Sequence, residues 1–136
     1  MRTAIITSLT LGLSLAACGS DLCDRYVALS KNGIAEATAC GASTTATYNA
    51  AACKQDETNC SDADKKTVGI YLDCLSNLKS PSCSASASTA DKNAALATYG
   101  QAASACATSS SIGSLSSACQ KALSAAVTTD NSVTLP

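Results

Sequence analysis

The sequence predicts an all-α fold, a small disulfide-stapled bundle of about four to five helices. Between residues 21 and 126, apolar residues recur at intervals of three and four, the spacing of one helix face, and no stretch alternates as a half-buried strand does. Large apolar side chains are scarce, so the core would be marginally stable by itself. Eight of the nine cysteines lie in this span, and four disulfides would supply the missing stability.

The first two helices are expected on either side of Gly41. An amphipathic helix is predicted over residues 21–39, because Asp21 can cap its start and Gly41 follows its end. A second helix is predicted over residues 43–54. The polar run over residues 55–59 then predicts a loop.

Two capping signatures mark the starts of the next two helices. Ser61, with Asp64 three residues later, predicts the start of a third helix, which Pro81 would stop. Ser88, with Asp91 three residues later, predicts the start of a fourth.

The last part of the chain predicts one more helix and a tail. Apolar spacing favours a fifth helix over residues 112–126. The small polar residues 82–88 predict a connector, and residues 128–136 have no period and predict a flexible tail. We therefore expect one cysteine-rich helical domain over residues 21–127.

The first 18 residues have a different character. Arg2 precedes an apolar run of roughly 14 residues, which is too short for a helix that spans a bilayer. The run ends in Leu15-Ala16-Ala17-Cys18. This arrangement resembles the signal peptide and lipobox of bacterial lipoprotein precursors.

That resemblance implies a cleaved signal peptide over residues 1–17 and a lipid anchor on Cys18, with residues 18–20 as a short tether. It implies a bacterial envelope membrane as the location. The outer membrane is favoured where the host has one, because Gly19 stands where retained lipoproteins carry an aspartate. The cysteine count agrees, since removing Cys18 leaves an even set. The chain is also similar to small cysteine-rich bacterial lipoproteins, a type that implies no known activity.

The eight remaining cysteines are expected to form structural disulfides. They are Cys23, Cys40, Cys53, Cys60, Cys74, Cys83, Cys106 and Cys119. Eight cysteines allow 105 pairings. We expect a Cys106–Cys119 bridge, because these two residues lie at similar distances on either side of the predicted turn between the last two helices.

The other pairings stay open. Cys53–Cys60 would close the loop between them, and Cys40 has two alternative partners, Cys74 and Cys83. A metal or redox role is disfavoured, because the chain has no Cys-x-x-Cys motif and no histidine.

Composition restricts the function further. The formal net charge is −1, so the chain lacks the basic footprint of a nucleic-acid-binding protein. The absence of histidine removes the commonest general base and metal ligand. We therefore expect no catalytic residues, no cofactor, no metal and no nucleic-acid partner.

Four groups of residues are candidate sites that also have simpler explanations. The acids around Cys60 offer oxygen atoms to calcium but do not fit an EF-hand; they are Asp56, Glu57, Asp62 and Asp64. Ser76-x-x-Lys79 matches a motif of penicillin-binding enzymes without their other motifs. An enzyme would need Asp62, Asp64 and Asp73 in one cleft, yet Asp62 and Asp73 are about 16 Å apart along a helix.

The fourth group consists of the four tyrosines, Tyr26, Tyr48, Tyr71 and Tyr99, which lie one in each of the first four predicted helices. They favour core packing, with a ligand groove as the alternative. The sequence as a whole favours a non-enzymatic binding or scaffolding protein with an unidentified envelope partner. The alternative is a surface-presented effector or inhibitor domain that its disulfides protect from proteases.

Overall fold

A computed structural model describes residues 21–81 and 83–130 and confirms the all-α fold class. The five α-helices are accompanied by one short 3-10 helix and two short strands. In chain order the elements are α1 (Asp21–Ala39), β1 (Thr45–Tyr48), α2 (Ala50–Glu57), α3 (Asp62–Ser76), α4 (Thr89–Ser110), η1 (Ile112–Ser114), α5 (Ser117–Ala126) and β2 (Val127–Asp130).

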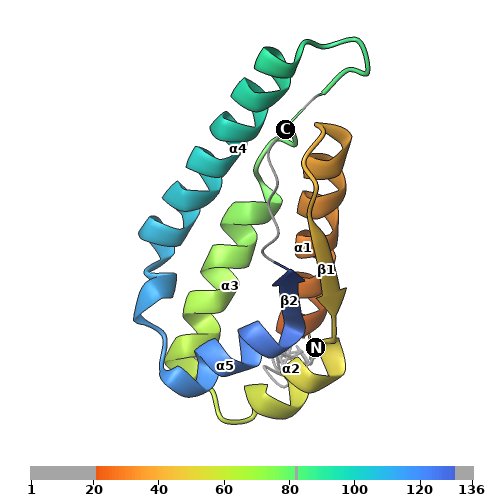
Figure 1. Cartoon of the computed structure of the whole chain (residues 1–136). Helices are drawn as coiled ribbons and strands as arrows, with labels where there is room; N and C mark the ends of the chain where they lie inside the picture. The colour runs from red at the N-terminus through yellow and green to blue at the C-terminus, as the bar shows by residue number, and fades with distance from the viewer. Residues whose placement is uncertain (1–20, 82, 131–136) are drawn as a thin grey trace, which may run out of the picture.

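Three long helices give the molecule its length. Helices α1, α3 and α4 run lengthwise, and α3 contacts the other two (Figure 1). Helices α2 and α5 pack together across one end, beside the starts of α1 and α3; we call this end the base. At the opposite end, here called the far end, α1 and α3 finish and α4 begins.

The helix starts follow the predicted capping chemistry. The hydroxyl of Ser61 accepts a hydrogen bond from the Asp64 amide at 3.1 Å, and Ser88 caps the Asp91 amide at 3.2 Å. Helix α1 ends as predicted: Gly41 adopts a φ of +91°, a left-handed conformation that favours glycine after a helix.

The prediction of a helix over residues 43–54 is wrong in its first half. Thr45–Tyr48 forms strand β1, which pairs antiparallel with β2, so that Tyr48 lies opposite Val127. Threonine and tyrosine favour strands, but the partner that completes the pair is some eighty residues away. The same pairing orders residues 128–130, which the sequence assigned to a flexible tail.

Three further helix ends differ from the prediction. Helix α2 continues to Glu57, into the part of the chain that was expected to form the loop over residues 55–59. Helix α3 ends at Ser76, before Pro81 is reached. The expected fifth helix is divided, because Ile112–Ser114 forms η1 and α5 begins only at Ser117. Ser116 caps α5 through its hydroxyl, so the chain changes direction between the two pieces.

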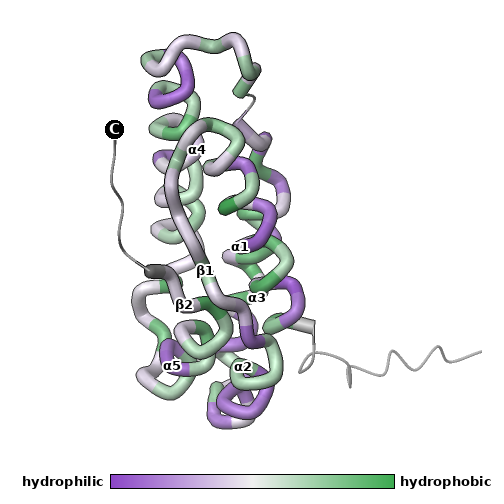
Figure 2. The backbone as a smooth tube through the Cα atoms, turned by 45° about the vertical axis from the view of Figure 1, so that its right-hand side comes forward, coloured by the Kyte–Doolittle hydropathy of each residue, from purple (hydrophilic) through white to green (hydrophobic). Residues whose placement is uncertain are grey.

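The core lies mainly between α3, α5 and the first half of α1. Val68 and Leu72 of α3 are 2% and 0% exposed and pack with Leu115, Ala122 and the Cys60–Cys119 bridge. A second cluster at the base surrounds Cys23 and Cys53. Most of α4 is only weakly hydrophobic (Figure 2), because alanine and small polar residues dominate its sequence.

Candidate functional site

All eight cysteines of the described part are used in four disulfides. The prediction of a Cys106–Cys119 bridge is wrong, and so is the Cys53–Cys60 pairing that was considered for the loop. Of the two alternatives for Cys40, the bridge to Cys83 is present. The pairs are Cys23–Cys53, Cys40–Cys83, Cys60–Cys119 and Cys74–Cys106, with Cα–Cα distances of 5.8, 5.1, 4.8 and 5.6 Å.

The pairing follows from how the helices pack. Helix α4 contacts α3, so Cys106 meets Cys74. Helix α5 crosses the base and does not run back along α4, so Cys119 meets Cys60 at the start of α3 (Figure 1). The lipobox residues Leu15, Ala16, Ala17 and Cys18 lie outside the described residues.

The acids near Cys60 do not converge on one point. Asp56 pairs with Lys121 at 3.4 Å, and Asp62 is exposed at the start of α3. Asp64 accepts hydrogen bonds from the hydroxyl and the amide of Ser116, which lower its pKa and join the starts of α3 and α5. Within residues 21–81 and 83–130, no group of three or more His, Cys, Asp or Glu is placed to hold a metal ion.

The acids considered for catalysis are also separated. Asp73 forms an ion pair with Arg25 that joins α3 to α1, whereas Asp64 is engaged with Ser116 at the base. The Ser76 hydroxyl donates to the backbone carbonyl of Asp73 at 2.8 Å. These residues therefore serve as helix contacts and a helix end, and they do not form one shared cleft.

Glu57, at the end of α2, is a buried acid with only 5% of its surface exposed. Its Oε2 lies 3.2 Å from Sγ of Cys23. Because that sulfur belongs to a disulfide and has no proton, the contact is a hydrogen bond only if a neutral carboxyl donates it. Within the described residues Oε1 has no hydrogen-bond partner. Burial raises the pKa of Glu57; the charges of Lys65 and Lys54 oppose this rise, and Asp24 adds to it.

We expect Glu57→Gln to stabilise the protein at neutral pH, with a gain that grows as the pH rises above the ordinary glutamate pKa of 4.5. Above the unfolded-state pKa of 4.5, the unfolded wild-type chain releases this proton before the folded chain does. The free energy of unfolding of the wild type therefore falls until the pH passes the raised pKa, whereas glutamine stays neutral. Denaturant titrations at several pH values measure the difference.

The control is Asp62→Asn, which removes an exposed carboxylate from the first turn of α3. A carboxylate is favourable at a helix start, so this variant should not be more stable than the wild type. A Glu57→Gln effect that is constant with pH would show that Glu57 does not carry the proton proposed for it.

The tyrosines divide into three core residues and one at the edge of a cleft. Tyr26 and Tyr71 pack against the main core, and Tyr48 packs against the second cluster at the base. Tyr99 crosses from α4 toward α1, where its hydroxyl lies 3.7 Å from the position that a Cβ on Gly33 would occupy. Burial, followed by the charge of Glu36, raises the pKa of Tyr99, so its hydroxyl keeps its proton at neutral pH.

The α3–α4 cleft lies at the far end, between the segment that follows α3 and the first half of α4. Its volume is about 390 Å³, which is in the range of small-molecule sites. Its walls are Leu78, Lys79, Ser80 and Pro81 on one side and Ala95, Thr98, Tyr99 and Ala102 on the other. The cleft is open to solvent and mainly apolar.

Four polar side chains line this cleft, and two of them, Lys79 and Tyr99, are available to a ligand. The hydroxyl of Thr98 donates to the carbonyl of Ala94 at 2.9 Å, and the hydroxyl of Ser80 donates to Glu36. The amine of Lys79 and the hydroxyl of Tyr99 make no hydrogen bond within the described part of the chain. A cation and a neutral donor are therefore free at the edge of an apolar surface.

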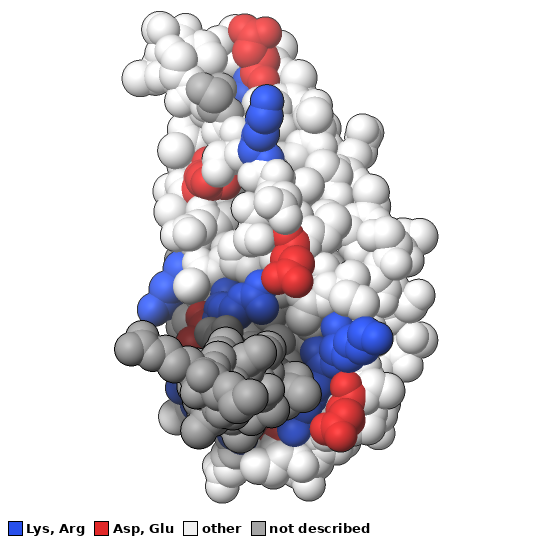
Figure 3. All heavy atoms as spheres, turned by 180° about the vertical axis from the view of Figure 1, so that it is seen from behind, with Lys and Arg blue, Asp and Glu red and all other residues white. Residues whose placement is uncertain are grey.

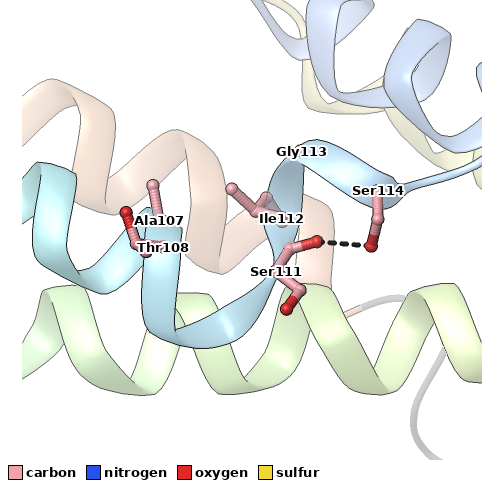
Figure 4. A pocket seen from close by; sticks show the side chains of 6 residues that line it. All are labelled: Ala107, Thr108, Ser111, Ile112, Gly113 and Ser114. Atoms are coloured by element: carbon pink, nitrogen blue, oxygen red, sulfur yellow. Dashed lines mark hydrogen bonds between the residues drawn. The ribbon is translucent and has the colours of Figure 1, made fainter.

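A second, shallower cleft of about 400 Å³ lies where α4 turns into η1 (Figure 4). Its lining residues are Ala107, Thr108, Ser111, Ile112, Gly113 and Ser114. The hydroxyl of Ser114 donates to the carbonyl of Ser111 at 2.7 Å, and that of Thr108 donates to the Ser104 carbonyl. With no charged side chain in its lining, it offers a ligand less than the α3–α4 cleft does.

Comparisons with models of known protein families, with curated proteins and with solved structures find no significant match. The described helices include none that is long and apolar enough to cross a membrane.

Sequence reasoning placed Tyr99 among the core residues and did not connect it with Lys79, which lines the same cleft. Lys79 lies beyond the end of α3, so helical spacing gives no indication of which way its side chain faces. One signal was available: Ala95 and Ala102 lie on the same face of a helix as Tyr99, and alanines beside a single large ring leave space unfilled.

Proposed function

We propose that this chain is a lipid-anchored protein of a bacterial envelope that acts as a non-enzymatic binding module. The observation that carries the proposal is the way in which the nine cysteines are used. All eight cysteines after Cys18 are used in four internal disulfides, which favours an oxidising compartment. The remaining thiol belongs to the lipobox-like sequence Leu15-Ala16-Ala17-Cys18, where lipoproteins take their anchor.

The short connection to the domain supports a fixed orientation. Helix α1 begins at Asp21, so only two residues separate it from Cys18, and the three Cα–Cα steps between them reach at most about 11 Å. An anchor on Cys18 would therefore hold the base close to the bilayer. Helix α1 has 19 residues and is about 28 Å long, so a domain anchored in this way and standing upright would hold its far end well away from the membrane.

The surface favours contact with a partner other than the bilayer. Several charges of the base occur in pairs of opposite sign, Lys54 with Asp24 and Lys121 with Asp56. Figure 3 shows charged side chains of both signs, separated by broad uncharged areas. Such a surface gives little net attraction to an anionic bilayer. The α3–α4 cleft, at the far end, is then presented to the space beyond the membrane.

The test is the intact mass of the full chain after expression in a bacterium and extraction with detergent. We expect a chain that begins at Cys18, carries a diacylglyceryl group and shows eight alkylatable thiols only after reduction. Cys18→Ser should abolish the acyl mass, because sulfur is the atom that takes the lipid. The matched control, Ser20→Ala, changes a neighbour of similar size and should leave the acyl mass in place.

Either of two results would overturn the proposal. One is a mature chain without acyl mass, and the other is a native chain whose thiols react before reduction. In the first case Cys18 is an ordinary residue of the chain, and in the second the disulfides do not form in the compartment where the protein resides.

A further inference from the structure

We propose that the α3–α4 cleft binds a small aromatic carboxylic acid. This inference deepens the binding role proposed above but does not depend on the anchor, so the two can fail separately.

The shape of the cleft favours a flat apolar body. The rings of Tyr99 and Pro81 line it together with the side chain of Leu78. On the α4 wall beside Tyr99, Ala95 and Ala102 are too small to fill the space, and the resulting volume of about 390 Å³ accommodates a ligand of one or two fused rings. Aromatic ligands gain both from burial and from offset or edge-to-face contact with a tyrosine ring.

The one charged side chain that lines the cleft favours an acid. Lys79 lines it, and Lys92 lies three residues before Ala95, on the same side of α4. Glu36 is the opposing charge from α1, and it already accepts a hydrogen bond from Ser80. Asp91, four residues before Ala95, lies on this side of α4 as well and accepts a hydrogen bond from Ser88, so the charges around the cleft are balanced. Lys79 is the only charged side chain in the lining itself. A carboxylate there can accept hydrogen bonds from the amine of Lys79 and the neutral hydroxyl of Tyr99.

Two disulfides hold the walls of the cleft in place. Cys40–Cys83 fixes the segment that follows Pro81 to the end of α1. Cys74–Cys106 fixes α3 to α4, four residues before Leu78 on one wall and four residues after Ala102 on the other. Walls that are covalently held need not be ordered by the ligand, which reduces the cost of binding.

The experiment titrates the full-length protein in a zwitterionic detergent with 2-naphthoate and, separately, with 2-naphthamide. The amide has the same rings and no charge. The readout is the NMR shift of the Tyr99 ring and of the Lys79 side chain. We expect saturable shifts of both residues with the naphthoate, and binding that is about fivefold weaker with the amide.

Variants separate the contribution of charge from that of shape. Lys79→Gln should weaken naphthoate binding about fivefold and leave amide binding unchanged, whereas Glu36→Gln should strengthen naphthoate binding. Ala102→Leu should fill the cleft and abolish both. The controls are Lys66→Gln, at the base, and Ala97→Leu, on the opposite face of α4, and neither should change binding.

Three results would overturn the inference. The first is the absence of saturable shifts at Tyr99 and Lys79. The second is naphthoate binding that survives Ala102→Leu, and the third is equal binding of the acid and the amide. None of these outcomes bears on the acyl mass at Cys18, so failure here leaves the proposed anchor intact.

Discussion

Replacing Cys60 and Cys119 together by alanine is expected to lower the free energy of unfolding by about 4 kcal/mol. This bridge closes the longest of the four disulfide loops, with a sequence separation of 59, so its removal restores the most conformational freedom to the unfolded chain. It also joins α5 to the start of α3 inside the main core. Alanine is the suitable replacement because both positions are buried and a serine hydroxyl would need a partner.

Guanidinium denaturation of the double variant and the wild type measures this loss. The matched comparison is Cys74→Ala with Cys106→Ala, whose loop has a separation of 32. The chain-entropy relation predicts that its loss is about 0.5 kcal/mol smaller. A loss below about 1 kcal/mol for the Cys60–Cys119 variant would show that this bridge does not limit the unfolded chain.

Leu72→Ala is expected to lower the free energy of unfolding by about 3 kcal/mol. Leu72 is 0% exposed and occupies the middle of the main core cluster. The molecule has few other large apolar side chains to move into the space, so the cavity would remain largely open. The cost then includes the lost burial of the side chain and the cavity that it leaves.

Ile70→Ala is the control for this substitution. It removes the same number of carbon atoms from the same helix, two residues away, at a position that is 49% exposed. Its loss should be below about 1 kcal/mol. Urea denaturation of both variants measures the two losses of free energy of unfolding. Equal losses would contradict the described core.

The features that sequence predicted well are local. A serine cap with an aspartate three residues later is a contact within one turn, and both predicted caps are present at Ser61 and Ser88. The spacing of three and four that predicts the helices also puts Val68 and Leu72 on one face of α3, and both are buried in the main core. Such signals need only a few neighbouring residues, so they can be read without knowledge of the fold.

The features that sequence missed depend on distant partners. The strand Thr45–Tyr48 becomes visible only beside Val127–Asp130. The pairing of Cys119 depends on the direction of α5, which turns across the base after Ser116. The α3–α4 cleft likewise forms only where the segment after α3 meets a face of α4. No local sequence pattern shows that these two segments come together.

The order of the four disulfides has a consequence for a chain that is cut. Every peptide bond between Cys23 and Cys119 is spanned by at least one bridge, because the loops overlap from one end of this interval to the other. A single nick anywhere in it leaves two pieces that stay covalently joined. With a lipid on Cys18, both pieces would stay on the membrane, so shedding of the domain would require a cut before Cys23 or a reductant.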